Sequence, residues 1–250
     1  MMFSIFRPKY KKTLFEGLID IHNHLLPGID DGSKSVGMSL EMLRLFETLG
    51  FAGTIPTPHI YQELYPNTPQ SIAQAAQTLE AAIADKSGGP LYGWRSKGFA
   101  AEYMVDETFM TLLDQKSALL TLPGQYILVE MHFFGQLDLI KEACFALCSA
   151  GYKPILAHPE RYALIDDLAD YSALKHQGFA LQLNALSLLG HYGPQVKEKA
   201  LKMLDHGLFD FVGTDAHHPG HLKSLQQLVL SQKQGLRWEA IVDNQKNVFV

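Results

Sequence analysis

Residues 20–32 read DIHNHLLPGIDDG and place two histidines and three aspartates within thirteen positions. The overlapping segment 17–22, GLIDIH, has the short apolar run of a buried β-strand. Alternate residues of an extended strand point to the same side, so His22 and His24 are positioned to bind one metal ion. A His-x-His pair alone is a weak signal, and its weight depends on what the rest of the chain supplies.

Short apolar runs alternate with amphipathic stretches along most of the chain. This pattern is typical of a parallel sheet that is buried on both faces and connected by helices. Seven or eight such units in 250 residues favour a closed β/α barrel over an open sheet. Strands are expected at 17–22, 51–59, 91–94, 98–103, 126–131, 153–159, 179–185 and 209–218, and helices at 33–50, 68–86, 106–115, 137–150, 168–176, 195–205 and 222–234.

The composition is that of an ordinary globular protein, with 47% apolar and 19% charged residues. We expect one domain over residues 18–250 and an N-terminal arm at 1–17, and no integral membrane segment. The net charge of −5 argues against a nucleic-acid partner. Cys144 and Cys148 lie four residues apart in an expected helix, which favours two core residues over a disulfide framework and agrees with a reducing, cytoplasmic location.

Ionisable side chains recur where the expected strands end. Any one of them would more often be structural than a ligand, but the carboxyl ends of all strands in a barrel converge on one rim. Carboxylates crowded there repel one another unless a positive charge lies between them, which indicates a multinuclear metal centre. Imidazole and carboxylate ligands without thiolates suit manganese, iron or zinc. The residues concerned are His22, His24, His59, Glu102, Glu130, His158, Asp215 and His217.

A resemblance to a known family rests on six motifs. They are DIHNHLLPGIDDG at 20–32, TPH at 57–59, AAEY at 100–103, ILVE at 127–130, LAHPERY at 156–162 and VGTDAHH at 212–218. From residue 18 to about 230 the chain resembles the polymerase-and-histidinol-phosphatase (PHP) family of metal-dependent phosphoesterases. Within that family it is most similar to the bacterial protein-tyrosine phosphatases encoded with capsule and exopolysaccharide genes. The resemblance implies a single-domain, distorted TIM-like (β/α)7 barrel.

The resemblance also implies three divalent metal ions. Manganese is the expected metal, and iron or zinc are the alternatives. Carried over residue by residue, one ion takes His22, His24, Glu102 and Asp215, a second shares Glu102 and adds Glu130 and His158, and a third takes Asp31, His59 and His217. Related barrel amidohydrolases usually bridge two metals with a lysine on a middle strand. This chain offers Glu102 there, which disfavours amide hydrolysis.

The predicted activity is that of a metal-dependent, non-cysteine protein-tyrosine phosphatase, a phosphoric monoester hydrolase. Hydroxide activated by the metals is expected to attack phosphorus, while Arg161 binds the phosphoryl oxygens. An ion pair with Glu160 or another acid is the alternative role of Arg161. A tyrosine leaving group, with a pKa of about 10, needs little acid assistance, which favours an aryl ester. The aromatic segments 60–65 and 132–136 are candidates for flanking its ring.

The predicted substrate is a tyrosine-phosphorylated protein, either a bacterial tyrosine kinase or a polysaccharide-assembly protein. Two alternatives stay open: a small-molecule phosphatase such as a histidinol phosphatase, and a non-catalytic module that binds phosphotyrosine. The oligomeric state is also open. Among the other polar residues, Asp20 is expected to support a ligating histidine, Asp30 to stabilise the turn, and His132 and His218 to lie at the rim.

Overall fold

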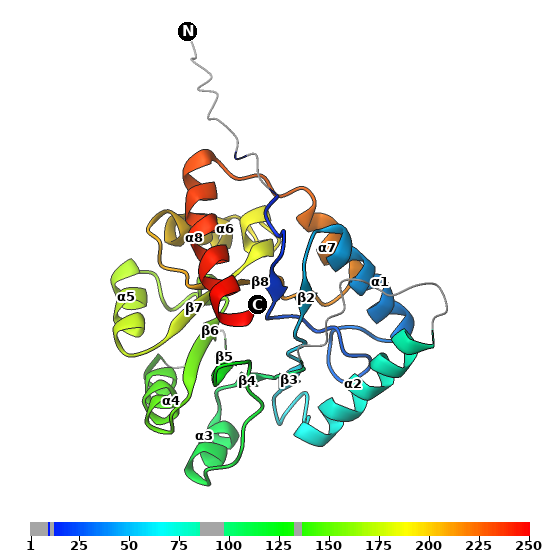
Figure 1. Cartoon of the computed structure of the whole chain (residues 1–250). Coiled ribbons are helices and arrows are strands. Elements are labelled where there is room, and N and C mark those ends of the chain that lie inside the picture. The colour runs from blue at the N-terminus through cyan, green and yellow to red at the C-terminus, as the bar shows by residue number, and fades with distance from the viewer. Residues whose placement is uncertain (1–9, 11–12, 86–97, 133–136) are drawn as a thin grey trace.

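The computed structural model describes residues 10, 13–85, 98–132 and 137–250. Short parallel strands occupy its centre and helices surround them (Figure 1). The strands form one sheet of two and one sheet of six, and the six follow one another in chain order. The first sheet pairs β1 (Ile19–Asp20) with β2 (Gly53–Thr54), and the second contains β3 (His59–Ile60), β4 (Glu102–Met104), β5 (Tyr126–Glu130), β6 (Lys153–Ala157), β7 (Ala180–Asn184) and β8 (Phe211–Gly213).

Backbone hydrogen bonds outside the strands connect the two sheets. After β1 and β8, Asp215 N donates to His22 O at 2.8 Å and His24 N donates to Ala216 O at 3.0 Å. On the other side, Ala100 N donates to Pro56 O at 2.9 Å. The predicted α/β fold with parallel strands is confirmed. The barrel is distorted, because two linked sheets take the place of one continuous ring of strands.

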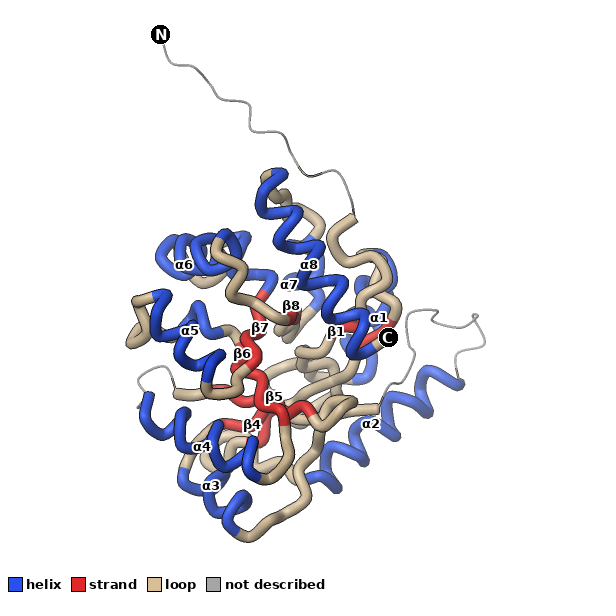
Figure 2. Tube along the Cα trace, turned by 60° about the vertical axis from the view of Figure 1, so that its left-hand side comes forward, coloured by secondary structure: helices blue, strands red, loops and turns tan. Residues whose placement is uncertain are grey.

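The helices cover the outer side of the strands (Figures 1 and 2). Several begin at side-chain caps, such as Thr68 before α2 and Ser231 before α8, where the hydroxyl accepts a backbone N–H of the first turn. The α-helices are α1 (Val36–Thr48), α2 (Pro69–Ala84), α3 (Glu107–Asp114), α4 (Leu137–Ser149), α5 (Leu168–His176), α6 (Pro194–Asp205), α7 (Pro219–Leu225) and α8 (Gln232–Phe249), and the 3₁₀ turns are Pro159–Arg161 and Ala185–Leu189.

Buried apolar residues form two clusters, one between strands and helices and one inside the ring of strands. The inner cluster includes Phe249 at the end of α8, whose ring lies 5.3 Å from that of Phe211 and 5.6 Å from that of Tyr126. Phe211 and Tyr126 are the first residues of β8 and β5. The end of α8 therefore fills the amino-terminal side of the strands, and the carboxyl ends are left for the polar residues.

The first and last expected strands, 17–22 and 209–218, are shorter than predicted, since β1 has two residues and β8 has three, and two expected elements are each divided in two. The expected strand 51–59 is divided into β2 and β3, because Pro56 and Pro58 lack the N–H that a sheet interior requires. The expected helix 222–234 is two helices, α7 and α8, and α8 runs to Phe249. A new cap at Ser231 starts α8, which the apolar spacing alone did not indicate.

Some expectations fall on residues that are not described. The expected strand 91–94 lies outside the described residues, as do most of the arm and positions 133–136 of the second aromatic segment. Within the arm, Phe15 is buried and its ring stacks on Phe51 at 5.0 Å. The boundary between arm and domain at residue 17 stays a prediction. No helix in the described part of the chain has both the length and the apolar character needed to cross a membrane.

Candidate metal centre

The nine residues predicted as ligands lie together in four overlapping groups, most of them in or just after a strand and Asp31 in the turn that follows His24. Within each group the potential ligand atoms lie within 4.8 Å of one another. Neighbouring strands therefore bring together residues that are up to 195 positions apart (His22 to His217). The groups are His22, His24 and Glu102; His22, His158 and Asp215; His59, Glu102 and Glu130; and His24, Asp31, His59 and His217.

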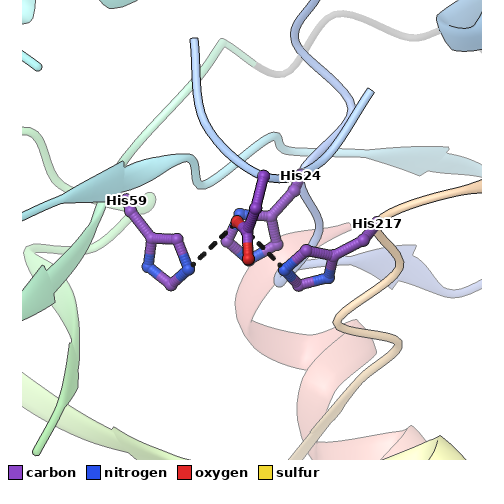
Figure 3. Close-up of side chains that lie close together, drawn as sticks. His24, His59 and His217 are labelled. Carbon is purple, nitrogen blue, oxygen red and sulfur yellow. Dashed lines mark ion pairs between the residues drawn. The ribbon is translucent and has the colours of Figure 1, made fainter. Parts of the chain in front are cut away.

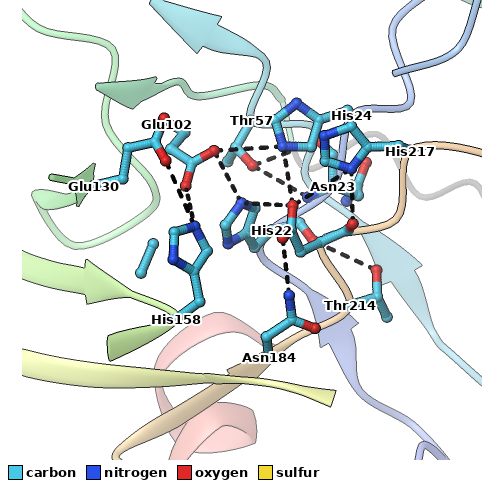
Figure 4. A network of polar contacts seen from close by, with 12 residues as sticks. His22, Asn23, His24, Thr57, Glu102, Glu130, His158, Asn184, Thr214 and His217 are labelled. Carbon is cyan, nitrogen blue, oxygen red and sulfur yellow. Dashed lines mark hydrogen bonds and ion pairs between the residues drawn. The ribbon is translucent and has the colours of Figure 1, made fainter. Parts of the chain in front are cut away.

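Glu102, the first residue of β4, lies at the middle of the centre (Figure 4). Its Oε2 is 3.1 Å from His22 Nε2 and 3.4 Å from His24 Nε2. Asp215 Oδ1 approaches the same two nitrogens at 3.4 and 3.3 Å. Two imidazoles and two carboxylates thus point their ligand atoms at one small space.

These atoms are buried but lack the hydrogen bonds that burial normally demands. His22 Nε2, His24 Nε2, His59 Nδ1 and Glu102 Oε2 are each without a hydrogen-bond partner. Buried polar atoms left unpaired are destabilising, and native proteins rarely leave several of them side by side. Divalent cations bound between these side chains would supply the missing partners. The donor set therefore fits a metal centre.

A second part of the centre lies between β3, β5 and β6. His158 Nε2 is 3.1 Å from Glu102 Oε1 and 3.7 Å from Glu130 Oε2. His59 Nδ1 lies 3.2 Å from Glu102 Oε2 and 3.1 Å from Glu130 Oε1. Glu102 therefore faces several imidazoles with its two oxygens, which is the arrangement that a bridging carboxylate requires.

The third part is the most exposed. Asp31 Oδ1 lies 3.6 Å from His59 Nε2 and 3.4 Å from His217 Nε2, so the two imidazoles approach one carboxylate from opposite sides (Figure 3). The Asp31 side chain is 46% exposed, in contrast to the buried Glu102. Solvent and substrate therefore have access to the centre from this side.

Three histidines are oriented by hydrogen bonds at their other ring nitrogen. His22 Nδ1 donates to Gln182 Oε1 at 2.7 Å, and His24 Nδ1 donates to Asp30 Oδ2 at 2.8 Å. His217 Nδ1 donates to the backbone oxygen of Asp215 at 2.9 Å. A proton fixed on Nδ1 leaves the lone pair on Nε2, which is the tautomer and orientation that metal-binding histidines commonly adopt.

The second oxygen of Asp215 is held by neighbouring side chains. Asp215 Oδ2 accepts hydrogen bonds from Arg161 Nη1 at 2.9 Å, from Asn184 Nδ2 at 2.8 Å and from Tyr192 Oη at 3.3 Å. The Arg161 guanidinium also lies over the Tyr192 ring at 4.3 Å. These contacts leave Oδ1 directed at His22 and His24. Of the two roles considered for Arg161, the ion pair exists, but its partner is Asp215 rather than Glu160.

The pKa directions follow from this crowding. Burial alone would raise the pKa of Glu102, but His22 and His59 outweigh it and hold that pKa well below its usual value. Burial alone would lower the pKa of His22, but Glu102 and Asp215 raise it to about 9. The negative carboxylates thus attract cations to this space, either protons or metal ions.

Two residues of the centre have strained backbones. His158 has φ 35° and Asp215 has φ 49°, in the left-handed region that residues other than glycine seldom occupy. Each follows a strand, His158 directly after β6 and Asp215 two residues after β8. Strain of this kind persists where the surrounding structure fixes it and often marks functional sites.

A cavity of about 270 Å³, here called the phosphate cavity, opens over the centre. Arg161 and His132 line it together with the candidate ligands other than His22 and His24, and Tyr61, Leu64 and Tyr65 form an apolar wall. The Tyr65 ring stacks on His59 at 5.3 Å with an angle of 12° between the planes. The cavity therefore combines a charged floor with an aromatic side.

The sequence interpretation missed several supporting residues. Gln182 and Asn184 alternate along the apolar strand β7 and point into the centre, a pattern that could have indicated them. Asp30 was interpreted as a turn residue; it does accept Gly32 N, but it also orients His24. Asp20 was expected to support a ligating histidine and instead bonds Thr214 and Asn23, so it joins β1 to the end of β8.

Comparison with known proteins gives consistent results. A family model described as "Capsular polysaccharide synthesis, CpsB/CapC" matches residues 18–228. The tyrosine-protein phosphatase YwqE of Bacillus subtilis is 32% identical over 209 residues, which cover 80% of this chain and 78% of that protein. CapC of Staphylococcus aureus is 29% identical over 202 residues, with coverages of 80% and 77%.

The similarity extends to a solved structure. A chain from the crystal structures of YwqE from Bacillus subtilis and CpsB from Streptococcus pneumoniae superposes with a TM-score of 0.73 and 28% identity. The match covers 91% of this chain and 95% of that one. Those two proteins are described as unique metal-dependent tyrosine phosphatases.

Proposed function

Because the chain belongs to the CpsB/CapC family of capsular polysaccharide synthesis, we propose that it is a metal-dependent protein-tyrosine phosphatase. One observation carries this proposal: buried imidazole and carboxylate atoms converge beneath an open cavity without hydrogen bonds of their own. The names of the relatives support the chemistry, since YwqE is a tyrosine-protein phosphatase and YwqE and CpsB are described as metal-dependent.

We assign three divalent ions to the centre, with manganese as the preferred metal and iron or zinc as alternatives, because the ligands are imidazoles and carboxylates. The distances support the assignment in three parts. The first ion would be held by His22, His24, Glu102 and Asp215, the second by Glu102, Glu130 and His158, and the third by Asp31, His59 and His217. His59 Nδ1 also approaches Glu102 and Glu130, so the His59 ring stands between the second and third positions.

Bound divalent ions supply Lewis acidity and a water-derived nucleophile at neutral pH. The residues of this chain supply the positioning. Arg161, anchored on Asp215 and stacked on Tyr192, presents a planar cation to phosphoryl oxygens at the edge of the phosphate cavity. A tyrosine phenolate, with a pKa of about 10, departs with little proton assistance, which agrees with the absence of an assigned general acid.

The apolar wall of the phosphate cavity supports an aryl phosphate as substrate. Tyr65 N and Tyr61 N each bond the backbone oxygen of the other, so the turn that carries them is closed and rigid. Leu64 is 65% exposed at its tip. An aromatic ring that entered the cavity would pack against these side chains while its phosphate reached the floor.

We further propose that the substrate is a tyrosine-phosphorylated protein of polysaccharide assembly, such as a bacterial tyrosine kinase, and that the reaction takes place in the cytoplasm. The family description supports the link with capsular polysaccharide. The net charge of −5 argues against a nucleic-acid substrate.

A substrate panel tests the proposal. Manganese-loaded protein is assayed with a phosphotyrosine peptide, the matching phosphoserine peptide and histidinol phosphate, and phosphate release is measured. The phosphotyrosine peptide is expected to give the highest kcat/KM. Equal or faster turnover of histidinol phosphate would select a small-molecule phosphatase, and tight binding of phosphotyrosine without turnover would select a binding module.

Arg161 has a separate test. Arg161→Ala is expected to lower kcat by roughly 10²- to 10³-fold, as removal of a donor to developing charge commonly does, while metal content stays unchanged. Arg161→Lys keeps the charge without the planar fork and is expected to recover part of the loss. Arg44→Ala, at an exposed position of α1, is the control. A fully active Arg161→Ala enzyme would refute the assigned role.

A further inference from the structure

A second cavity of about 320 Å³, here called the side cavity, lies beside the phosphate cavity and has no role in the chemistry described above. Its apolar lining comes from the residue after His59, from β4, and from α3 and the segment that follows it. These residues are Ile60, Tyr103, Met104, Phe109, Leu112 and Leu119.

The side cavity exists because the outer layer of helices opens here. Among the described residues, α2 packs against α1 and α3 packs against α4. In both views of the chain, α2 and α3 lie on different sides of β4 (Figures 1 and 2). Apolar side chains that a neighbouring helix would otherwise cover therefore face an open space between the start of α2 and α3.

Three polar side chains around the side cavity are already paired within the protein. Asp106 Oδ1 accepts Phe109 N at 2.8 Å as the cap of α3, and Asn67 Nδ2 donates to the backbone oxygens of Ile29 and His59. Tyr103 Oη accepts Leu120 N at 2.8 Å. No described residue that lines the side cavity has a buried side-chain atom without a partner. An occupant would therefore be recognised by its apolar surface.

The side cavity adjoins the phosphate cavity. Met104, the last residue of β4, lines both of them. Successive residues of β4 face different surroundings: Glu102 lies in the metal centre and Tyr103 lies in the outer core. A peptide that leaves the phosphate cavity over Met104 would therefore come to the side cavity next.

We propose that the side cavity binds an apolar side chain of the substrate protein close to the phosphotyrosine in sequence. This inference rests on the proposed function. It concerns how the enzyme recognises the sequence around the phosphotyrosine, which the proposed function does not specify. An extended chain advances about 3.3 Å per residue, and the two cavities share Met104, so we expect the apolar residue within a few positions of the phosphotyrosine. The preferred substrates are then phosphotyrosine segments with a leucine, isoleucine or methionine on one flank.

The test uses peptides with phosphotyrosine among glycine and serine residues, into which one leucine is placed at each of the three positions on either side. The kcat/KM values are compared with that of the leucine-free parent. One position is expected to raise kcat/KM by roughly tenfold or more, the effect of burying a leucine side chain. The dissociation constants of the same peptides with a non-hydrolysable phosphonate give a second readout that does not depend on turnover.

Variants that fill the side cavity identify where the leucine binds. Ala118 lies exposed on the lining and Ser117 lies half-buried beside it, so Ala118→Phe and Ser117→Phe reduce the space without touching the phosphate cavity. Both are expected to abolish the leucine preference and to leave hydrolysis of p-nitrophenyl phosphate unchanged. Ala118→Ser is the matched control and keeps the preference.

The outcomes separate the two proposals. A leucine preference lost in both filling variants supports the side cavity as a subsite. Equal values for all peptides in kcat/KM and in phosphonate binding, or a preference that survives both variants, would overturn it. If the protein hydrolysed neither p-nitrophenyl phosphate nor the parent peptide, the proposed phosphatase activity would be wrong. The phosphonate dissociation constants would still show whether the side cavity binds leucine.

Discussion

At the scale of single residues, the centre depends on side chains that hold the ligands in place. Gln182 illustrates this, because its Nε2 donates to the backbone oxygen of Leu183 and so turns its Oε1 toward His22. Asp30 does the same for His24 and also accepts His59 N at 3.2 Å. Each bond fixes both the tautomer and the direction of an imidazole.

Asp30 gives a direct test at this scale. Asp30→Ala removes the acceptor of His24 Nδ1, so the ring can rotate and its Nε2 loses the fixed direction. We expect the affinity for manganese to fall by about 10- to 100-fold, the usual effect of losing such a support. Metal content after dialysis against defined free manganese measures it, with the exposed Asp85→Ala as control. Equal metal content in Asp30→Ala and the wild type would contradict the role.

Eight of the nine candidate ligands could be picked out from the sequence because they follow apolar runs, and the carboxyl ends of parallel strands meet, whereas Asp31 was placed by the family resemblance. The supporting residues were harder to predict, because their partners are distant. His22 and Gln182 are 160 positions apart, and Asp20 and Thr214 are 194 apart. The folding of β1 against the end of β8 brings such pairs together.

At the scale of elements, close approach between β8 and the end of β1 limits which residues fit. A Cβ on Gly213 would lie 2.6 Å from His22 Cβ and 2.9 Å from Gln182 Nε2, both well inside van der Waals contact. The bond from Thr214 to Asp20 holds the two segments together at the same place. Neither segment can move apart without breaking this bond.

Gly213→Ala is therefore expected to destabilise the protein by about 1–3 kcal/mol, as overpacking commonly does, and to weaken metal binding through His22. Gly37→Ala in α1 is the matched control, because its Cβ would meet only Ser35 Oγ at 3.8 Å. Alanine is favoured over glycine in a helix, so this control is expected to raise the Tm slightly. Thermal unfolding compares the two. A Gly213→Ala protein as stable as the wild type would show that the two segments can shift to accommodate the added methyl group.

The elements themselves followed from the apolar periodicity, and the errors have local causes. Pro56 and Pro58 interrupt an apolar run that otherwise resembles one strand. The expected helix 222–234 runs across two helices because Leu222 and Leu225 of α7 are followed at helical spacing by Leu228 and Val229 of the connecting segment. The cap formed by Ser231 and Gln234 is what separates the two helices.

At the scale of the whole molecule, the two ends of the strands have different roles, one in stability and the other in chemistry. The amino-terminal side is closed by the apolar contact of Phe249 with Phe211 and Tyr126. The carboxyl side carries the charged centre and its cavity. Stability and chemistry are thereby separated along the axis of the barrel.

This separation predicts that Phe249→Ala lowers the free energy of unfolding by about 3–5 kcal/mol, since it removes a large buried side chain. Metal content and KM of the folded protein are expected to stay unchanged. Denaturant unfolding measures the first, and metal analysis the second. Phe145→Ala, at a position that is 75% exposed, is the control. Loss of bound metal in folded Phe249→Ala would show that the two ends are coupled.

The most direct test of the account is to titrate manganese back into chelator-treated protein and to measure hydrolysis of a phosphotyrosine peptide at each step. The metal-free protein is expected to be folded and inactive, since buried carboxylates and imidazoles with no other pairing form the centre. Activity is expected to return and to reach a plateau at three equivalents, one for each part of the centre. Full activity in the metal-free protein, or a plateau reached at one equivalent, would contradict it.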